Sequence, residues 1–144
     1  RISRRLSIMA NGTIAFDTLT TSDSVNTNTE KSIDTSYIFN GVAKQWINLN
    51  GDGTAAITDS FNTTTFTDNG TGDYSVSITN AMINSTYSLA GISGDGTSAF
   101  NRGLSTGYGT APTTNLYRLV SITASSGAAT NCAYVSCQLN GELA

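Results

Sequence analysis

The sequence predicts an all-β protein: an antiparallel β-sandwich or barrel-like head preceded by a short β segment. Short apolar runs recur from residue 42 to residue 140, separated by clusters of Gly, Asn and Asp. The chain contains a single proline and shows no sustained helical period. Short segments at this spacing are typical of antiparallel sandwiches and barrels.

The first residues predict a small β ribbon. Residues 3–9 and 13–16 read as two strands around Asn11 and Gly12, since Asn-Gly favours the positive φ angles of a tight hairpin. An isolated two-stranded ribbon is marginal in water and cannot bury its own apolar side chains. We therefore expect copies of the chain to bury them jointly, and they are Leu6, Ile8, Ile14 and Phe16.

Residues 17–36 are rich in Thr, Ser and Asn and have almost no hydrophobic periodicity. This composition is typical of a linker or an extended strap. From Gly41 onward the apolar runs become dense. The sequence therefore predicts a β ribbon with its linker at residues 1–40 and a C-terminal β-sandwich head domain at residues 41–144.

The clearest strand of the head is 73–79, where Tyr74, Val76 and Ile78 alternate with polar residues. This alternation predicts one buried and one solvent-exposed face. Residues 68–70, Asp-Asn-Gly, are expected to form the turn before it. The same alternation near the end places Ala133, Val135, Cys137 and Leu139 on one face. The full set of expected strands is 42–49, 54–61, 63–67, 73–79, 86–92, 114–123 and 130–140.

The longest break between the expected strands is residues 93–113, and long loops on rigid scaffolds often carry binding sites. Aromatic faces and a guanidinium among small polar residues suit carbohydrate or protein surfaces. The alternative is that Phe100 and Tyr108 anchor the loop from beneath. The candidate ligand-binding residues are Asp95, Phe100, Asn101, Arg102 and Tyr108.

Trp46 is the only tryptophan and has apolar neighbours on both sides in sequence, so core packing is favoured over ligand stacking. Cys132 and Cys137 are too few for a disulfide framework. On one strand they would point to opposite faces, which disfavours a bond between them. We expect buried thiols, with an interchain bond or a metal role as the alternatives.

Charged residues make up 12% of the chain and the net charge is −3, which disfavours nucleic acid as a partner. No apolar run has the length of a membrane helix, so membrane insertion is not expected. The start of the chain lacks the long apolar region of a secretion signal. Because the chain begins at Arg1 instead of Met and a strand-like pattern begins at once, we expect it to be a piece cut from a longer protein.

The absence of histidine excludes a Ser-His-Asp arrangement and the usual zinc sites. The Asp residues lie beside Gly, Asn or Thr, where Asp usually serves in turns, so a glycosidase-type carboxylate pair is disfavoured. Residues 48–59 resemble the oxygen spacing of a calcium loop, but strand-like flanks favour a hairpin turn. We therefore expect no enzymatic activity, no cofactor and no metal.

Three stretches carry a resemblance to a known family: GVAKQWINLNGDGTAAITDSFN, FTDNGTGDYSVSITNAMINSTYSLAG and AYVSCQLNG. In order and spacing, across residues 42–141, they resemble the C-terminal domain of tailed-bacteriophage tail fibre proteins. The segment RRLSIMANGTIAF is similar to pieces of fibre shafts, which implies that residues 1–40 are a shaft segment and its linker. The chain departs from the family pattern at Cys132 and Cys137 and in the variable loop 94–112.

The resemblance implies a homotrimeric fibre tip of β-strands, at the distal end of the tail fibre in the virion, assembled in the bacterial cytoplasm. Its partners would be the upstream fibre and tail proteins and, on the host surface, a polysaccharide or an outer-membrane protein. Multivalent, non-covalent attachment is the leading hypothesis, because several weak sites acting together give high avidity. The alternatives are a trimerisation or capping module without receptor contact, and a polysaccharide depolymerase with its site between subunits.

Overall fold

The computed structural model describes residues 18–20, 32–96, 101–107 and 109–144. The chain divides into two units, residues 1–39 and 40–144. In the first unit, β1 (Thr18–Thr20) pairs antiparallel with β2 (Ser32–Asp34), and α1 (Thr35–Gly41) follows directly. The expected trimer-interface residues lie outside the described residues; they are Leu6, Ile8, Ile14 and Phe16.

The first unit thus holds short regular elements where the sequence predicted only a linker. The Asp34 carboxylate accepts a hydrogen bond from the backbone N–H of Ser36 at 2.8 Å, at the first turn of α1, as helix-capping residues do. None of the described residues of β1, β2 or α1 is buried. Among the described residues of this unit, elements this short and this exposed bury no core of their own.

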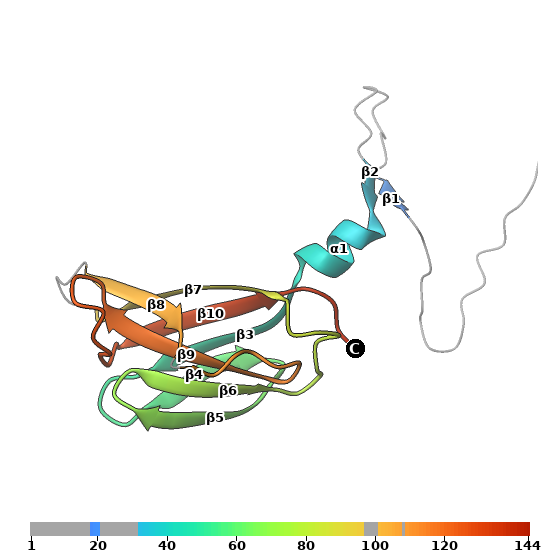
Figure 1. The fold of residues 1–144 in the computed structure, drawn as a ribbon. Coiled ribbons are helices and arrows are strands. Elements are labelled where there is room, and N and C mark those ends of the chain that lie inside the picture. Colours follow the sequence, from blue (N-terminus) through green and yellow to red (C-terminus); the bar gives the residue numbers. More distant parts are fainter. Residues whose placement is uncertain (1–17, 21–31, 97–100, 108) are drawn as a thin grey trace, which may run out of the picture. The chain divides into compact units, whose positions relative to one another are not determined.

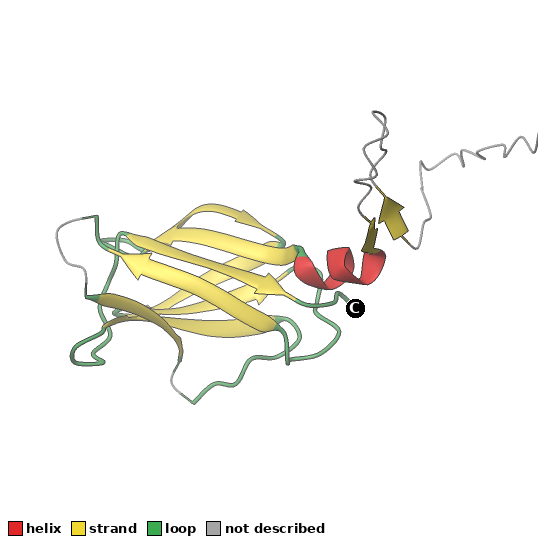
Figure 2. Ribbon diagram, turned by 90° about the horizontal axis from the view of Figure 1, so that it is seen from above, coloured by secondary structure: helices red, strands yellow, loops and turns green. Residues whose placement is uncertain are grey.

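The second unit is an antiparallel β-sandwich, which confirms the predicted fold class (Figure 1). One sheet has the strand order β4-β3-β10-β7 and the other the order β5-β6-β9-β8. The two sheets lie face to face, with loops at both ends (Figure 2). The strands are β3 (Ala43–Asn50), β4 (Ala56–Phe61), β5 (Thr63–Gly70), β6 (Asp73–Ile78), β7 (Ser88–Gly94), β8 (Arg102–Thr106), β9 (Leu116–Thr123) and β10 (Tyr134–Asn140).

The sequence did not predict β8, because it assigned residues 93–113 to one loop. The segment Arg-Gly-Leu-Ser-Thr contains one large apolar residue, Leu104, and shows no convincing alternation. It becomes an edge strand because β9 offers a partner, with Leu104 opposite Ser121. The strand conformation of residues 102–106 therefore depends on pairing with β9, which a pattern within the segment itself cannot reveal.

The core lies between the two sheets and follows the alternation seen in the sequence. Tyr74, Val76 and Ile78 of β6 are buried, as predicted, and so are Val135, Cys137 and Leu139 of β10. Cys132 lies before β10 and is also buried, so the two thiols do not point to opposite faces of one strand as expected. Both cysteines are free. The remaining large core residues are Ile47, Leu49, Met82, Tyr117 and Leu119.

A hydrogen-bonded pair crosses the core between the sheets. Gln45 of β3 and Tyr117 of β9 are both fully buried, and the Tyr117 hydroxyl donates to Gln45 Oε1 at 2.9 Å. Gln45 Nε2 donates in turn to Thr63 Oγ1 at 2.8 Å. A buried amide is tolerated only when such partners satisfy it, so this chain of bonds fixes β3 against β5 and β9.

Asn62 forms the corner where the chain passes from β4 in one sheet to β5 in the other. Its φ angle is 54°, a left-handed conformation that Asn tolerates better than most residues. Its side chain donates to the carbonyl oxygens of Lys44 at 2.9 Å and Asn80 at 3.2 Å, and it accepts from the Asn80 N–H at 2.7 Å. This corner therefore ties the edges of both sheets together.

Candidate functional site

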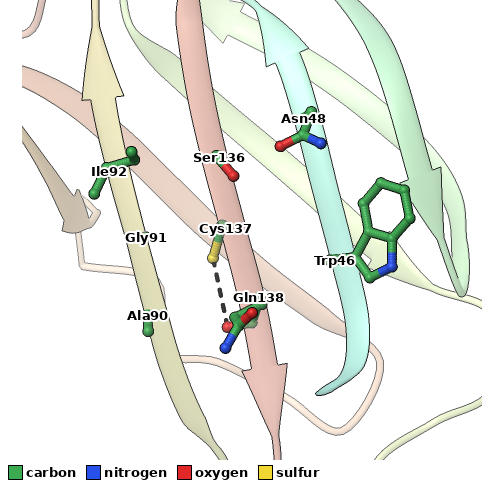
Figure 3. A pocket seen from close by; sticks show the side chains of 8 residues that line it. All are labelled: Trp46, Asn48, Ala90, Gly91, Ile92, Ser136, Cys137 and Gln138. Atoms are coloured by element: carbon green, nitrogen blue, oxygen red, sulfur yellow. Dashed lines mark hydrogen bonds between the residues drawn. The ribbon is translucent and has the colours of Figure 1, made fainter. Parts of the chain in front are cut away.

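The outer face of the β4-β3-β10-β7 sheet carries the most distinctive surface of the sandwich. Asn48, Ser136 and Ile92 lie directly opposite one another across β3, β10 and β7. Trp46, Gln138 and Ala90 form the next row. Figure 3 shows both rows on the three neighbouring strands.

Two hollows lie on this face and share residues. The first has a volume of about 510 Å³ and contains both rows. The second has about 530 Å³ and extends toward Asn50, Thr58 and Tyr134. Asn48, Ile92 and Ser136 line both, so the hollows join into one open depression along β10. We call it the outer groove and define it by Trp46, Asn48, Ile92, Tyr134, Ser136 and Gln138.

Trp46 belongs to the outer groove, so the prediction that it packs in the core is wrong. The inward positions of β3 are taken by Gln45, Ile47 and Leu49, which places Trp46 on the opposite face with Asn48. The sequence shows a polar residue, Asn48, two positions after Trp46 and therefore on the same face of the strand. The alternation of polar and apolar residues was nevertheless hard to recognise, because the polar residue Gln45 occupies a core position.

The outer groove and the loop that the sequence singled out meet at Tyr134. This residue is 67% exposed and pairs with Gly94 of β7. A methyl group placed on Gly96 would lie 2.8 Å from Tyr134 Cε2, so the ring lies directly against the start of the loop. The described start of the loop therefore borders the outer groove.

Three of the loop candidates are described by the structure, and they bind other parts of the protein. Arg102 lies on β8 and forms an ion pair with Asp95 at 2.8 Å, which ties the end of β7 to the start of β8. Arg102 also donates to Thr123 Oγ1 at 3.3 Å. Asn101 donates to Ser125 Oγ at 2.6 Å. The other two candidates, Phe100 and Tyr108, lie outside the described residues.

Two titratable groups of the sandwich, Asp73 and Cys137, are shifted from their usual behaviour by their surroundings. The Arg118 guanidinium makes two hydrogen bonds to Asp73, which lowers the pKa of that carboxyl. Burial raises the pKa of the Cys137 thiol to about 12. At neutral pH this thiol stays protonated and is a poor nucleophile.

The calcium-like segment forms the β3–β4 hairpin, as the sequence analysis favoured. Its flanks are antiparallel strands, with Asn50 opposite Ala56. The Asn50 side chain accepts a hydrogen bond from the Asp52 N–H at 2.9 Å, and Asp52 accepts from the Gly53 N–H at 3.0 Å. Among the described residues, no group of three His, Cys, Asp or Glu side chains is arranged to hold a metal ion.

Comparison of the chain with protein-family models, with curated proteins and with solved structures finds no match. In the part of the chain that the structure describes, no helix has the length and apolar character needed to cross a bilayer.

Proposed function

We propose that this chain is the distal end of a tailed-bacteriophage tail fibre and attaches the virion to the bacterial host by multivalent, non-covalent binding. The observation that carries this proposal is the outer groove, an open surface of aromatic and neutral polar side chains beside the variable loop. The resemblance of residues 42–141 to fibre C-terminal domains suggests attachment, and the outer groove offers a surface on which a receptor could bind. An open site suits weak binding that gains strength through several copies.

The proposed assembly is a homotrimer, joined to upstream fibre and tail proteins. The support within the described residues is that β1, β2 and α1 contain no buried residue. Tyr37 and Phe39 of α1 are 71% and 65% exposed. A helix this short is not stable alone in water, and contact with the same helix in other copies would bury these rings.

The same exposed helix favours the second candidate, a trimerisation or capping module without receptor contact. The two candidates differ in what the outer groove does. A capping module leaves the groove inert, whereas an attachment head binds host cells through its own surface. For a depolymerase, two of the carboxylates that could form an acid pair are already held by cations: Asp73 is paired with Arg118 and Asp95 with Arg102.

The attachment function is tested with the purified full chain and a panel of bacterial strains. The fluorescently labelled chain should bind one or more strains saturably. The unlabelled chain should then slow the adsorption of phages that infect those strains. A chain that forms trimers but binds none of the strains, and leaves adsorption unchanged, would favour the capping module instead.

A further inference from the structure

We propose that the outer groove binds a neutral oligosaccharide segment of the host surface, with sugar rings against Trp46 and Tyr134 and hydroxyls bonded to Asn48 and Ser136. This inference rests on the proposed attachment function and deepens it. It names the chemical class of the receptor and moves the binding residues from the loop to the sheet.

The first support is the alternation of flat apolar surface and free polar groups. The Asn48 amide and the Ser136 hydroxyl make no hydrogen bond to another described side chain. They lie in one row between Trp46 on one side and Tyr134 on the other. A sugar ring presents an apolar face and a rim of hydroxyls, which matches aromatic surface beside amide and hydroxyl groups.

The second support is the shape of the groove. The small side chains of Ala90 and Ser136 keep its floor low, and its two parts are each within the range of about 300–1,000 Å³ typical of small-ligand sites. Tyr134 and Gln138, the residue opposite Trp46, are separated along β10 by about 13 Å at roughly 3.3 Å per residue. An extended chain of a few sugars fits this length better than a compact ligand.

The third support is charge. Among the described residues that line the two hollows, there is no Lys, Arg, Asp or Glu. Asp59 of β4 lies opposite Asn48 and brings a carboxylate to the border of the groove. An acidic polysaccharide would be repelled there and would find no cation in the lining, so the fit is to neutral sugars.

The surface also differs from an interface between permanent partners. The cores of such interfaces are more apolar than the rest of the surface and are packed as densely as protein interiors. Here the row of Asn48, Ser136 and Ile92 holds two free polar groups beside one exposed apolar side chain, and open volume lies above it. The outer face of the other sheet offers no equivalent: its described positions include Thr65, Thr67, Ser75 and Ser77, without an aromatic ring.

Trp46 provides the assay, because the chain contains only one tryptophan. The probe is the neutral polysaccharide purified from a strain that the chain binds, fragmented to oligosaccharides and titrated into the full chain. We expect a saturable change of tryptophan emission. Tyr134→Ala should raise Kd about tenfold, and Asn48→Ala about three- to tenfold, the loss expected for a stacked ring and one hydrogen bond.

Two matched variants serve as controls. Thr65→Ala changes an exposed strand residue on the other sheet, and Ile83→Ala removes an apolar side chain that is 53% exposed outside the groove. Both should bind with unchanged Kd. Thermal unfolding should be the same for all four variants, because each changed side chain is exposed.

Two results would overturn the inference while leaving attachment intact. One is a chain that binds cells with unchanged affinity after Tyr134→Ala and Asn48→Ala. The other is binding that survives removal of surface polysaccharide and is lost on protease treatment of the cells, which would identify a protein receptor. Failure of the unmodified chain to bind any cells would instead remove the attachment function, and this inference with it.

Discussion

The buried pair Tyr117 and Gln45 offers a quantitative test of how the two sheets are held together. Tyr117→Phe removes one hydroxyl and leaves Gln45 Oε1 buried without its 2.9 Å donor. Leaving a buried acceptor unsatisfied costs about 1–3 kcal/mol, more than the net worth of an average hydrogen bond. Since both residues are fully buried, we expect Tyr117→Phe to lower the free energy of unfolding by about 2 kcal/mol.

The double variant decides whether the unsatisfied acceptor is the cause. Replacing Gln45 by Met in the Tyr117→Phe background removes both buried polar partners while keeping similar volume. The double variant should then be more stable than the sum of the single effects predicts, by roughly 1 kcal/mol or more. Urea unfolding followed by Trp46 fluorescence measures this at one protein concentration, because association would make stability concentration-dependent. Additive effects, or a Tyr117→Phe cost below about 0.5 kcal/mol, would refute the reasoning.

Three further predictions concern the sandwich. Asn62→Ala loses the corner hydrogen bonds and strains a φ of 54°, so it should cost about 2–3 kcal/mol and Asn62→Gly about 1 kcal/mol less; equal losses in urea unfolding would reject the backbone contribution. Gly91→Ala would place a methyl 2.5 Å from the Ser136 carbonyl oxygen and should lower stability by about 1–3 kcal/mol, measured in the same way. Asp73→Asn should lower stability at neutral pH. Because Arg118 lowers the pKa of folded Asp73 below its usual 3.8, this contribution is present above that pH and is lost as the pH falls through the folded pKa. Wild type and Asp73→Asn should therefore converge in acid, and a gap that persists there would contradict the ion-pair explanation.

The sequence supports the fold more fully than the site. The alternation of Tyr74, Val76 and Ile78 predicted a half-buried strand, and the structure buries all three. β8 and the outward position of Trp46 were missed for one physical reason, since each depends on partners distant in sequence. Residues 102–106 become a strand through pairing with β9, and Gln45 enters the core because Tyr117 satisfies it.

For the candidate site, too, the sequence revealed features within one segment but not those that depend on contacts between distant segments. The loop around Asp95 and Arg102 was recognised from its length and composition, yet the structure pairs these two side chains with each other. The outer groove is assembled from β3, β7 and β10, which are adjacent only in the folded sheet. Residue types were visible in the sequence, but their placement in one row needed the strand register.

The most direct test of the proposed attachment function uses a tailed bacteriophage whose fibres end in this chain. The adsorption rate of particles carrying Tyr134→Ala is measured on a strain that the chain binds, beside particles carrying Thr65→Ala. Attachment through the outer groove predicts that Tyr134→Ala slows adsorption markedly while Thr65→Ala adsorbs like the unmodified phage. Equal adsorption rates for all three, with fibres assembled in equal amounts, would contradict the assignment of host attachment to this face of the sandwich.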